Sequence, residues 1–232
     1  MAFIHSPRMV TDGLVLVYDF ANAKSYISGS TIVNNLLPQT ITGSFENNPT
    51  ITFNNCGELN FVVQTPAQQV NSGDIQVLNP ELESFSIVVW ARVPLGGTTV
   101  QCLASKRISS LNGYYLGVIN GNTTFITADS TLRRTDCGVG GNITSGSWRM
   151  YTGIINREQT TQTIVVDNNQ LSTTVNLLGT GSHTSNGQFL IGNANGANPF
   201  SGSIGCVMAY RKALTPSEID QNYNALRARY GV

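Results

Sequence analysis

The stretch that most constrains the fold of this chain is residues 188–219, in which short apolar runs alternate with turn-forming residues. Residues 188–192 and 200–210 have the length and the apolar or small side chains that are typical of strands. Residues 193–199 between them are rich in asparagine and glycine, which tolerate the positive φ angles of tight turns. The stretch is therefore predicted to contain a strand, a polar loop and a second strand.

A helix is predicted directly after the second strand. Thr215, Pro216 and Glu218 form a capping box, with threonine as the cap, proline at the first helical position and glutamate three residues after the cap. The helix should run over residues 216–230 and carry one apolar face, formed by Ile219, Tyr223, Leu226 and Tyr230. We expect it to cover an edge or the mouth of a β-sandwich.

Most of the remaining chain has the composition of strands joined by turns. Residues 84–93 (SFSIVVWARV) are β-branched and aromatic without a glycine, which predicts a central strand with Trp90 in the core. Residues 41–83 give a weaker pattern, with strands at 50–53 and 57–63 and a loop at 66–74. Further strands are expected at residues 13–20, 100–106, 113–119, 123–128, 147–156 and 163–167. A length of 232 residues suits one β-sandwich domain.

Three motifs carry a resemblance to a known family. They are T-D-G-L-V-L-V-Y-D-F-A-N-A-K-S-Y at residues 11–26, F-S-I-V-V-W-A-R at 85–92, and the succession I-G, G-S-I, Y and R-K-A-L-T-P-S-E-I within 188–219. Together they resemble laminin-G-like, concanavalin A-like jelly-roll domains. The resemblance implies an all-β, two-sheet antiparallel jelly-roll sandwich at residues 13–232 that ends in a short helix at 216–230, preceded by an N-terminal arm at 1–12.

The chain departs from the family pattern at two places. Gly205 stands where relatives usually carry an acidic residue after G-S-I, so any role of that carboxylate is absent. Residues 34–40 (NNLLPQT) replace the usual aspartate- and glycine-rich loop. A calcium or sugar site at that loop is therefore not expected.

The opening motif is similar to proteins common in tailed-phage genomes, and this resemblance implies a function. It predicts a non-enzymatic structural protein of the virion, displayed as a decoration, neck or fibre component that contacts host-surface glycans. Its partners would be other virion proteins and copies of itself, and its location the virion, assembled in the host cytoplasm. The alternatives are a bacterial carbohydrate-binding module and, less favoured by the residues, a glycoside hydrolase.

Charge and hydropathy exclude several other classes. Lysine plus arginine and aspartate plus glutamate each number 13, and only 11% of residues are charged. A neutral chain with so few charges is not expected to bind nucleic acid or an anionic membrane by neutralising their phosphates. Its first residues lack the apolar core of a signal peptide, and no run is long enough to span a bilayer.

Metal and catalytic sites are not predicted. Cys56, Cys102, Cys137 and Cys206 form no C-x-x-C pair, so we expect reduced, buried cysteines and neither zinc nor another cofactor. Glu81 and Glu83 precede a strand and are expected to be solvated rather than to face each other across a cleft. Four further carboxylates stand alone in the sequence: Asp129, Asp136, Asp167 and Asp220. His183 has no G-x-S-x-G motif nearby, so a serine nucleophile beside it is not predicted.

Two polar groups are candidates for sugar binding. Lectin-type sites combine amide side chains with an aromatic platform on loops at the edge of the sandwich. The first group is Asn193, Asn195, Asn198 and Phe200, and the second is Asn120, Asn122, Tyr114 and Tyr115. The alternative is that these asparagines only form the turns that their φ preferences suit.

The N-terminal arm is a candidate for assembly. It carries four apolar side chains before the first strand: Phe3, Ile4, Met9 and Val10. Burying such side chains contributes about 1.5–3 kcal/mol each, so they are expected to pack on something. Packing on a partner subunit predicts a homo-oligomer, and packing on the chain's own domain is the alternative.

Overall fold

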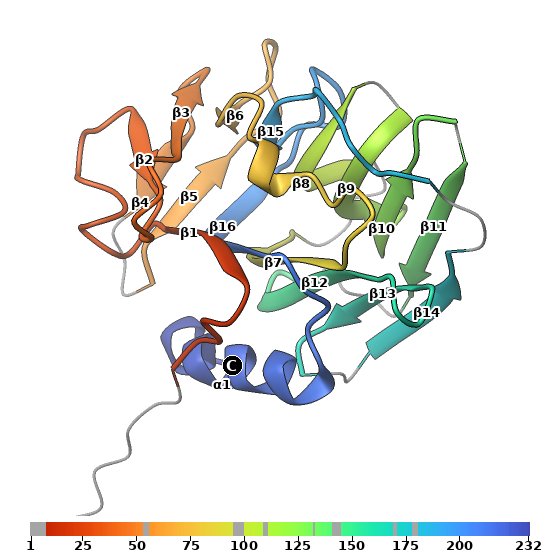
Figure 1. The fold of residues 1–232 in the computed structure, drawn as a ribbon. Coiled ribbons are helices and arrows are strands. Elements are labelled where there is room, and N and C mark those ends of the chain that lie inside the picture. Colours follow the sequence, from red (N-terminus) through yellow and green to blue (C-terminus); the bar gives the residue numbers. More distant parts are fainter. Residues whose placement is uncertain are drawn as a thin grey trace, which may run out of the picture.

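The computed structural model describes residues 8–52, 56–94, 100–108, 111–131, 133–140, 145–168, 171–177 and 181–232. Its strands form two antiparallel sheets that stack face to face, and one helix lies on the outer face of one of them (Figure 1). This is the two-sheet jelly-roll architecture with a C-terminal helix that the sequence predicts.

The first sheet has eight strands within the described residues, and its centre is β7 (Phe85–Arg92). β7 pairs with β12 (Trp148–Asn156) on one side and β16 (Gly202–Tyr210) on the other. The order continues outward through β13 (Thr161–Val166) and β14 (Leu171–Asn176) at one edge, and through β5 (Glu58–Phe61) and β4 (Thr50–Thr52) at the other. β1 (Leu14–Asp19) also pairs with β16.

The second sheet, also eight-stranded within the described residues, packs against the inner face of the first. Its order begins with β11 (Arg134–Val139), β10 (Asn122–Ala128), β9 (Leu111–Ile119) and β8 (Gln101–Ile108). It continues through β15 (Phe189–Ile191), β6 (Gln69–Asn71), β3 (Thr42–Glu46) and β2 (Ile32–Asn34). A single 3-10 turn, η1 (Gln76–Leu78), follows β6.

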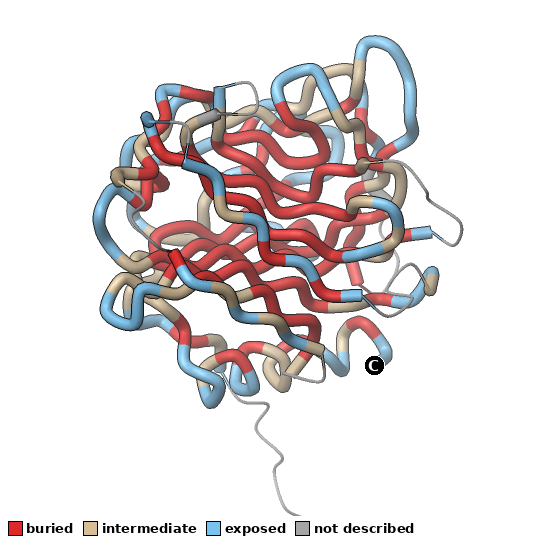
Figure 2. Tube along the Cα trace, turned by 90° about the vertical axis from the view of Figure 1, so that its right-hand side faces the viewer, coloured by how far each residue is buried: buried red, intermediate tan, exposed pale blue. Residues whose placement is uncertain are grey.

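The main core fills the space between the sheets, because side chains alternate along each strand. In β7, Phe85, Ile87 and Val89 point into this core, whereas Val88 and Trp90 point to the outer face of the first sheet. Figure 2 shows the buried segments concentrated in the stacked strands, with exposed residues in the connecting turns.

A second apolar cluster lies between the outer face of the first sheet and α1 (Pro216–Tyr230). Thr215 and Glu218 form the predicted capping box, and Gly231 ends the helix in the left-handed conformation at φ 72°. Tyr230 stacks on Trp90 with ring centroids 4.6 Å apart and lies 4.6 Å from the ring centroid of Trp148. Trp90 is fully buried as predicted, but its partners are helix side chains rather than the opposite sheet.

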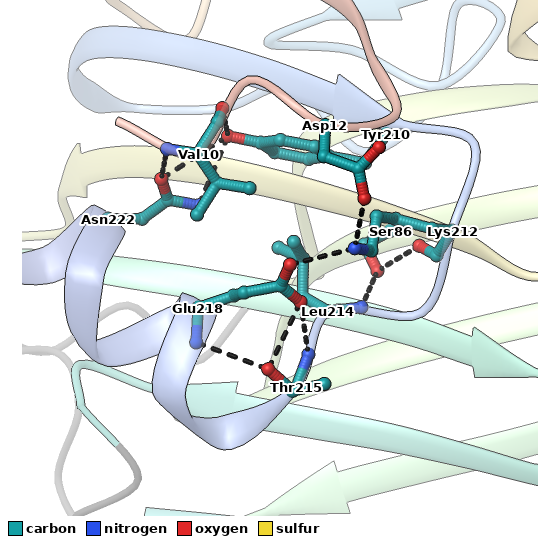
Figure 3. A network of polar contacts seen from close by, with 9 residues as sticks. All are labelled: Val10, Asp12, Ser86, Tyr210, Lys212, Leu214, Thr215, Glu218 and Asn222. Carbon is teal, nitrogen blue, oxygen red and sulfur yellow. Dashed lines mark hydrogen bonds and ion pairs between the residues drawn. The ribbon is translucent and has the colours of Figure 1, made fainter. Parts of the chain in front are cut away.

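The segment before β1 is fastened to α1 and to the strands beneath it (Figure 3). The Val10 amide donates to Asn222 Oδ1 at 2.9 Å, and the Tyr210 hydroxyl donates to the Val10 carbonyl at 3.2 Å. Lys212 bridges Asp12 at 2.6 Å and Glu218 at 2.7 Å. Residues 10–12 are thus held within the chain by hydrogen bonds and ion pairs.

This arrangement corrects the predicted assembly arm in part. Val10 is only 5% exposed and Met9 is partly buried against the cluster under α1, so both pack on their own chain. The Gln221 side chain also donates to the Arg8 carbonyl at 2.7 Å. Phe3 and Ile4 lie outside the described residues.

The long strands and the helix lie where the sequence places them, and the differences concern short or polar strands. Residues 66–74 were expected to form a loop but include β6, whose Val70 is fully buried between Phe45 and Ile191 in the sheet. β2, β3, β11 and β14 are additional strands without a sequence prediction. Their pairing partners, rather than strong local patterns, define them.

Candidate functional site

The first predicted sugar site, at residues 193–200, is corrected by the structure. Phe200 is 1% exposed and packs edge-on against Phe61, so it offers no platform to a ligand. Asn195 and Asn198 have φ angles of 53° and 57°, the left-handed conformation that asparagine tolerates in turns. The turn folds onto the outer face of the second sheet, where Ala194 packs with Tyr115 and Cys102.

Asn193 belongs instead to a strip of hydrogen-bonded polar side chains on that outer face. Its amide donates to Gln69 Oε1 at 2.7 Å, and the Gln69 amide in turn donates to Glu46. Asn71 donates to Glu46 Oε1 at 2.8 Å and to Gln188 Oε1 at 3.1 Å. We call Glu46, Gln69, Asn71, Gln188 and Asn193 the amide strip. Only Asn193 is a candidate from the sequence, because the other four lie on β3, on β6 and directly before β15, which are brought together only by the sheet.

The two tyrosines of the second predicted group point to opposite faces of the sheet, because side chains alternate along β9. Tyr114 points into the main core and is buried against Phe85, at a centroid distance of 5.1 Å. Tyr115 lies on the outer face, but it is also buried, with its hydroxyl donating to the Gln101 carbonyl at 2.7 Å and the Arg107 guanidinium 4.4 Å from its ring centroid. Neither tyrosine is therefore accessible as a platform.

Asn120 and Asn122 do come together, at the rim of a hollow on the outer face of the second sheet. The hollow has a volume of about 400 Å³ and is open to solvent on one side. We call it the asparagine hollow; its lining residues are Ile119, Asn120, Asn122, Thr124, Asp136, Gly138 and Gly140. The strands β9, β10 and β11 supply the lining, and the two-residue turn at Asn120 and Gly121 closes one end.

The floor of the asparagine hollow is left open by Gly138. This glycine pairs with Thr124 in the sheet. A Cβ atom at Gly138 would meet the Thr123 carbonyl oxygen only at 3.6 Å and Thr124 Oγ1 at 3.7 Å, which is ordinary van der Waals contact. Neither packing nor a positive φ angle demands glycine there, and any larger side chain would fill part of the hollow.

Some polar groups of the hollow are bonded within the chain, and others can bind a ligand. Asp136 accepts two short bonds from Arg134, from Nε at 2.5 Å and from an Nη atom at 2.6 Å, so its charge is neutralised locally. This pair raises the pKa of Arg134 above its usual value. The side-chain amides of Asn120 and Asn122 make no hydrogen bond within the described part of the chain, so they can donate to and accept from a ligand.

Two of the carboxylates considered for catalysis are held by ion pairs within the chain. Glu83 pairs with Arg211, and Asp167 accepts from Arg149 at 2.7 Å and from the Met150 amide at 3.0 Å. Asp220 accepts from the Asn168 amide at 3.4 Å, and Glu81 lies in a turn at φ 53°. Among the described residues these carboxylates line no hollow as an opposed pair.

The histidine considered for catalysis is also buried. His183 Nδ1 lies 2.9 Å from an Arg157 Nη atom, and the neighbouring Asp129 accepts the Gly181 amide at 2.6 Å. Burial, reinforced by the Arg157 charge, lowers the pKa of His183 to about 4. His183 is therefore neutral at pH 7 and packed into the structure.

The cysteines are buried and free. Burial raises the pKa of Cys102 to about 12 and that of Cys137 to about 11, so both remain thiols at pH 7. No group of three or more histidine, cysteine, aspartate or glutamate side chains comes together as a metal site in the part of the chain that is described. The prediction that all four cysteines act as small buried hydrophobes is confirmed.

These features define a lectin-like jelly-roll module with one sheet face covered by a helix and polar hollows on its surface. The chain belongs to the concanavalin A-like lectin/glucanases superfamily, because the model of that family matches residues 64–220. The family expectation from the sequence motifs is thus confirmed. No curated protein sequence gives a significant match to the chain.

Solved structures of toxin binding domains share the fold. The binding domain of Paraclostridial Mosquitocidal Protein 1 superposes with a TM-score of 0.72 at 15% identity, over 92% of this chain and 52% of that one. The binding domain of Botulinum neurotoxin DC, in complex with rat synaptotagmin II, gives a TM-score of 0.71 at 14% identity, again over 92% and 52%. The same neurotoxin domain in complex with SialylT gives 0.71 at 16% identity, over 93% and 52%.

The chain thus spans about half the length of these toxin domains. At such identities the likeness establishes the fold. Within the described residues, no helix is long and apolar enough to cross a membrane.

Proposed function

We propose that the protein is a non-enzymatic, lectin-like binding module that recognises carbohydrate through the outer face of the second sheet. The observation that carries the proposal is the asparagine hollow, in which two uncommitted amides face a floor left open by Gly138. Amides and hydroxyls match the paired donors and acceptors of sugar hydroxyls, because each of these groups can both donate and accept.

Two further features of this face support carbohydrate as the ligand class. The Asp136 charge is neutralised by Arg134, so the hollow presents hydrogen-bonding groups without a strong net charge. The amide strip lies further along the same outer face, on β3 and β6 and at both ends of β15, and gives a longer ligand a second set of polar groups. The structurally similar neurotoxin domain solved with SialylT supports the same class of ligand.

Binding should be tested with a panel of oligosaccharides and matched variants. Asn122→Ala removes an exposed amide, and Gly138→Val fills the floor of the hollow. Both should weaken binding, the first by roughly fivefold for one lost hydrogen bond of about 1 kcal/mol. Asn186→Ala, an exposed asparagine outside the hollow and the amide strip, is the control. Unchanged binding by both hollow variants would contradict this location.

We further propose that the module works on a tailed-phage virion, together with other virion proteins and copies of itself. The resemblance of residues 11–26 to proteins of tailed-phage genomes supports this role. A module that binds glycans would connect the particle to the host surface. Labelling intact particles with an antibody against the protein tests the proposal, and labelling only in the particle-free fraction of the lysate would contradict it.

The proposal of a non-enzymatic role rests on how the ionisable side chains are used. Glycoside hydrolysis needs two carboxyl groups separated by about 5–10 Å across a cleft. In the asparagine hollow the single carboxylate is Asp136, which is bound by Arg134. We expect no release of reducing sugar from any oligosaccharide that binds, and turnover abolished by Asp136→Asn would contradict this.

A further inference from the structure

A second hollow lies on the opposite sheet, beside the start of α1. It occupies about 350 Å³ on the outer face of β12, β13 and β14, beyond the part of that face that α1 covers. Its lining residues are Ile154, Asn156, Gln159, Thr161, Thr163, Val165, Ser172, Thr174, Ala213, Leu214, Thr215, Pro216 and Ile219. We call it the threonine groove.

The threonine groove has an apolar side and a hydroxyl side. Ile154, Val165 and Ile219 belong to the apolar cluster under α1 and continue it to the surface. Thr161, Thr163, Ser172 and Thr174 alternate outward on the two neighbouring strands β13 and β14 and form the other side. No lining side chain is charged, so the groove offers no side-chain counter-charge to an ionised ligand.

Several polar groups of the groove are available to a ligand. Thr163 and Thr174 hydrogen-bond each other at 2.9 Å, and each hydroxyl can still accept a further bond. Thr161, Ser172 and the Gln159 side chain make no side-chain hydrogen bond within the described residues. β13 and β14 hold the threonine and serine hydroxyls in fixed positions, which lowers the entropy cost of binding.

We infer that the threonine groove binds a neutral sugar ring, as a second carbohydrate site separate from the asparagine hollow. A pyranose ring has an apolar face of C–H groups that fits the isoleucine and valine side, and hydroxyls at its edge that fit the threonine and serine side. The uncharged lining favours a neutral sugar over a sialylated or phosphorylated one.

The groove also has room for a chain of more than one sugar. A hollow of about 590 Å³ adjoins it and shares Asn156, Gln159, Ala213 and Thr215 with it. The cations of this adjoining hollow are paired or bonded within the chain: Arg211 with Glu83, Lys212 with Asp12 and Glu218, and Arg157 with the Gly181 carbonyl at 2.8 Å. An extended neutral oligosaccharide could therefore run from β14 toward the end of the sandwich.

Chemical-shift mapping of the full chain with neutral oligosaccharides tests the inference. Malto-, cello- and manno-oligosaccharides are added to ¹⁵N-labelled protein, with a sialylated oligosaccharide and an uncharged threonine-rich peptide as comparisons. A neutral sugar should shift the amides of Thr163, Ser172 and Thr174 in a saturable manner, and the two comparison ligands should not. Shifts at Asn122 and Gly138 report on the asparagine hollow separately, so failure at one site is distinguishable from failure at the other.

A pair of tryptophan variants locates the site. Ser172→Trp places a large side chain in the groove, whereas Asn186→Trp places one at an exposed position away from the groove. The first should abolish the saturable shifts and the second should leave them. Thr161→Val removes only a hydroxyl and should weaken binding by roughly fivefold. This small change tests the site even if the tryptophan variant does not fold. Absence of saturable shifts in the groove with every neutral sugar, or saturable binding of the peptide there, would overturn the inference.

Discussion

At the scale of single residues, the contact between Gly205 and Tyr230 explains why glycine stands at a position where the family resemblance implies an acidic residue. The family resemblance implies an acidic residue after G-S-I, but here the position faces the ring of Tyr230. A Cβ atom at Gly205 would lie 2.4 Å from the Tyr230 hydroxyl oxygen and 2.6 Å from its Cε1 atom. The glycine therefore makes room for the tyrosine that stacks between Trp90 and Trp148.

Gly205→Ala should consequently destabilise the fold. The methyl group would displace Tyr230 from its stack, and overpacking of this kind costs about 1–3 kcal/mol. Gly138→Ala is the control, because the Cβ atom there meets no atom closer than 3.6 Å. Chemical denaturation of both variants should show a loss of stability in the first only. Equal midpoints for Gly205→Ala and the wild type would contradict the packing role.

His183 gives the protein a predictable response to acid. Burial and the Arg157 charge lower its pKa to about 4, against the ordinary value of 6.5 that it regains on unfolding, while Asp129 opposes the shift. Between these two values the unfolded state binds a proton that the folded state does not. The free energy of unfolding should therefore fall as the pH drops from about 6.5 to about 4, by up to about 3 kcal/mol at 1.36 kcal/mol per pH unit.

The comparison of the wild type with His183→Gln isolates this effect. Carboxylates titrate in both proteins, so the difference between their pH profiles belongs to the histidine. The wild type should lose stability more steeply than the variant between pH 6.5 and pH 4, as measured by urea denaturation at several pH values. Parallel profiles would show that His183 is not held neutral by its surroundings.

At the scale of elements, local sequence signals predict the long strands and the helix. The Thr215–Glu218 capping box and the left-handed Gly231 define α1, and both depend on neighbouring residues alone. Strands such as β6 and β14 are short or polar, and they exist because distant strands pair with them. Pairing of this kind has no local signature, so the sequence did not reveal it.

The candidate site was predictable only where one turn brings its residues together. Asn120 lies in a hairpin turn and Asn122 directly follows it, so they remain neighbours in the structure. Thr124, Asp136 and Gly138 join them through the register of three strands, which the sequence did not specify. The prediction of Phe200 as an aromatic platform for a sugar is wrong, because Phe200 packs against Phe61 in the core, a contact that the local sequence does not show.

The contact between the N-terminal segment and α1 leads to a prediction at this scale. Asn222 accepts from the Val10 amide at 2.9 Å and donates to the Tyr210 hydroxyl at 3.1 Å, and it is fully buried. Asn222→Ala leaves the Val10 amide without its acceptor and removes one partner of the Tyr210 hydroxyl, which costs about 1–3 kcal/mol. Hydrogen exchange at Val10 should accelerate.

Asn224→Ala is the matched control on the same helix. Asn224 is only partly buried and makes no side-chain hydrogen bond within the described residues. Its replacement should leave the exchange rate of Val10 unchanged. Equal acceleration in both variants would attribute the effect to the helix as a whole rather than to the Asn222 contact.

At the scale of the whole molecule, a helix covers part of the outer face of one sheet but not that of the other, among the described elements. α1 and the cluster beneath it occupy the outer face of the first sheet, and the threonine groove remains beyond the helix. The outer face of the second sheet carries no helix among the described elements, and it presents the amide strip and the asparagine hollow. The molecule therefore offers polar surfaces on opposite sides.

Assembly into oligomers or particles is tested by deleting residues 1–7. Met9, Val10 and Asp12 keep their contacts within the chain in such a variant, so its thermal unfolding should match that of the full chain. We predict that loss of Phe3 and Ile4 lowers the oligomeric state measured by sedimentation velocity. A deletion variant that sediments like the full chain would contradict a role of these residues in assembly.

The central claim, that the outer face of the second sheet binds carbohydrate, is tested most directly by locating a bound sugar. Crystals or ¹⁵N-labelled protein are exposed to the oligosaccharide that binds most tightly in the panel. The account predicts contacts or saturable shifts at Asn122, Thr124 and Gly138, all of which disappear in Gly138→Val. A sugar bound only away from this face, or binding that Gly138→Val leaves unchanged, would contradict it.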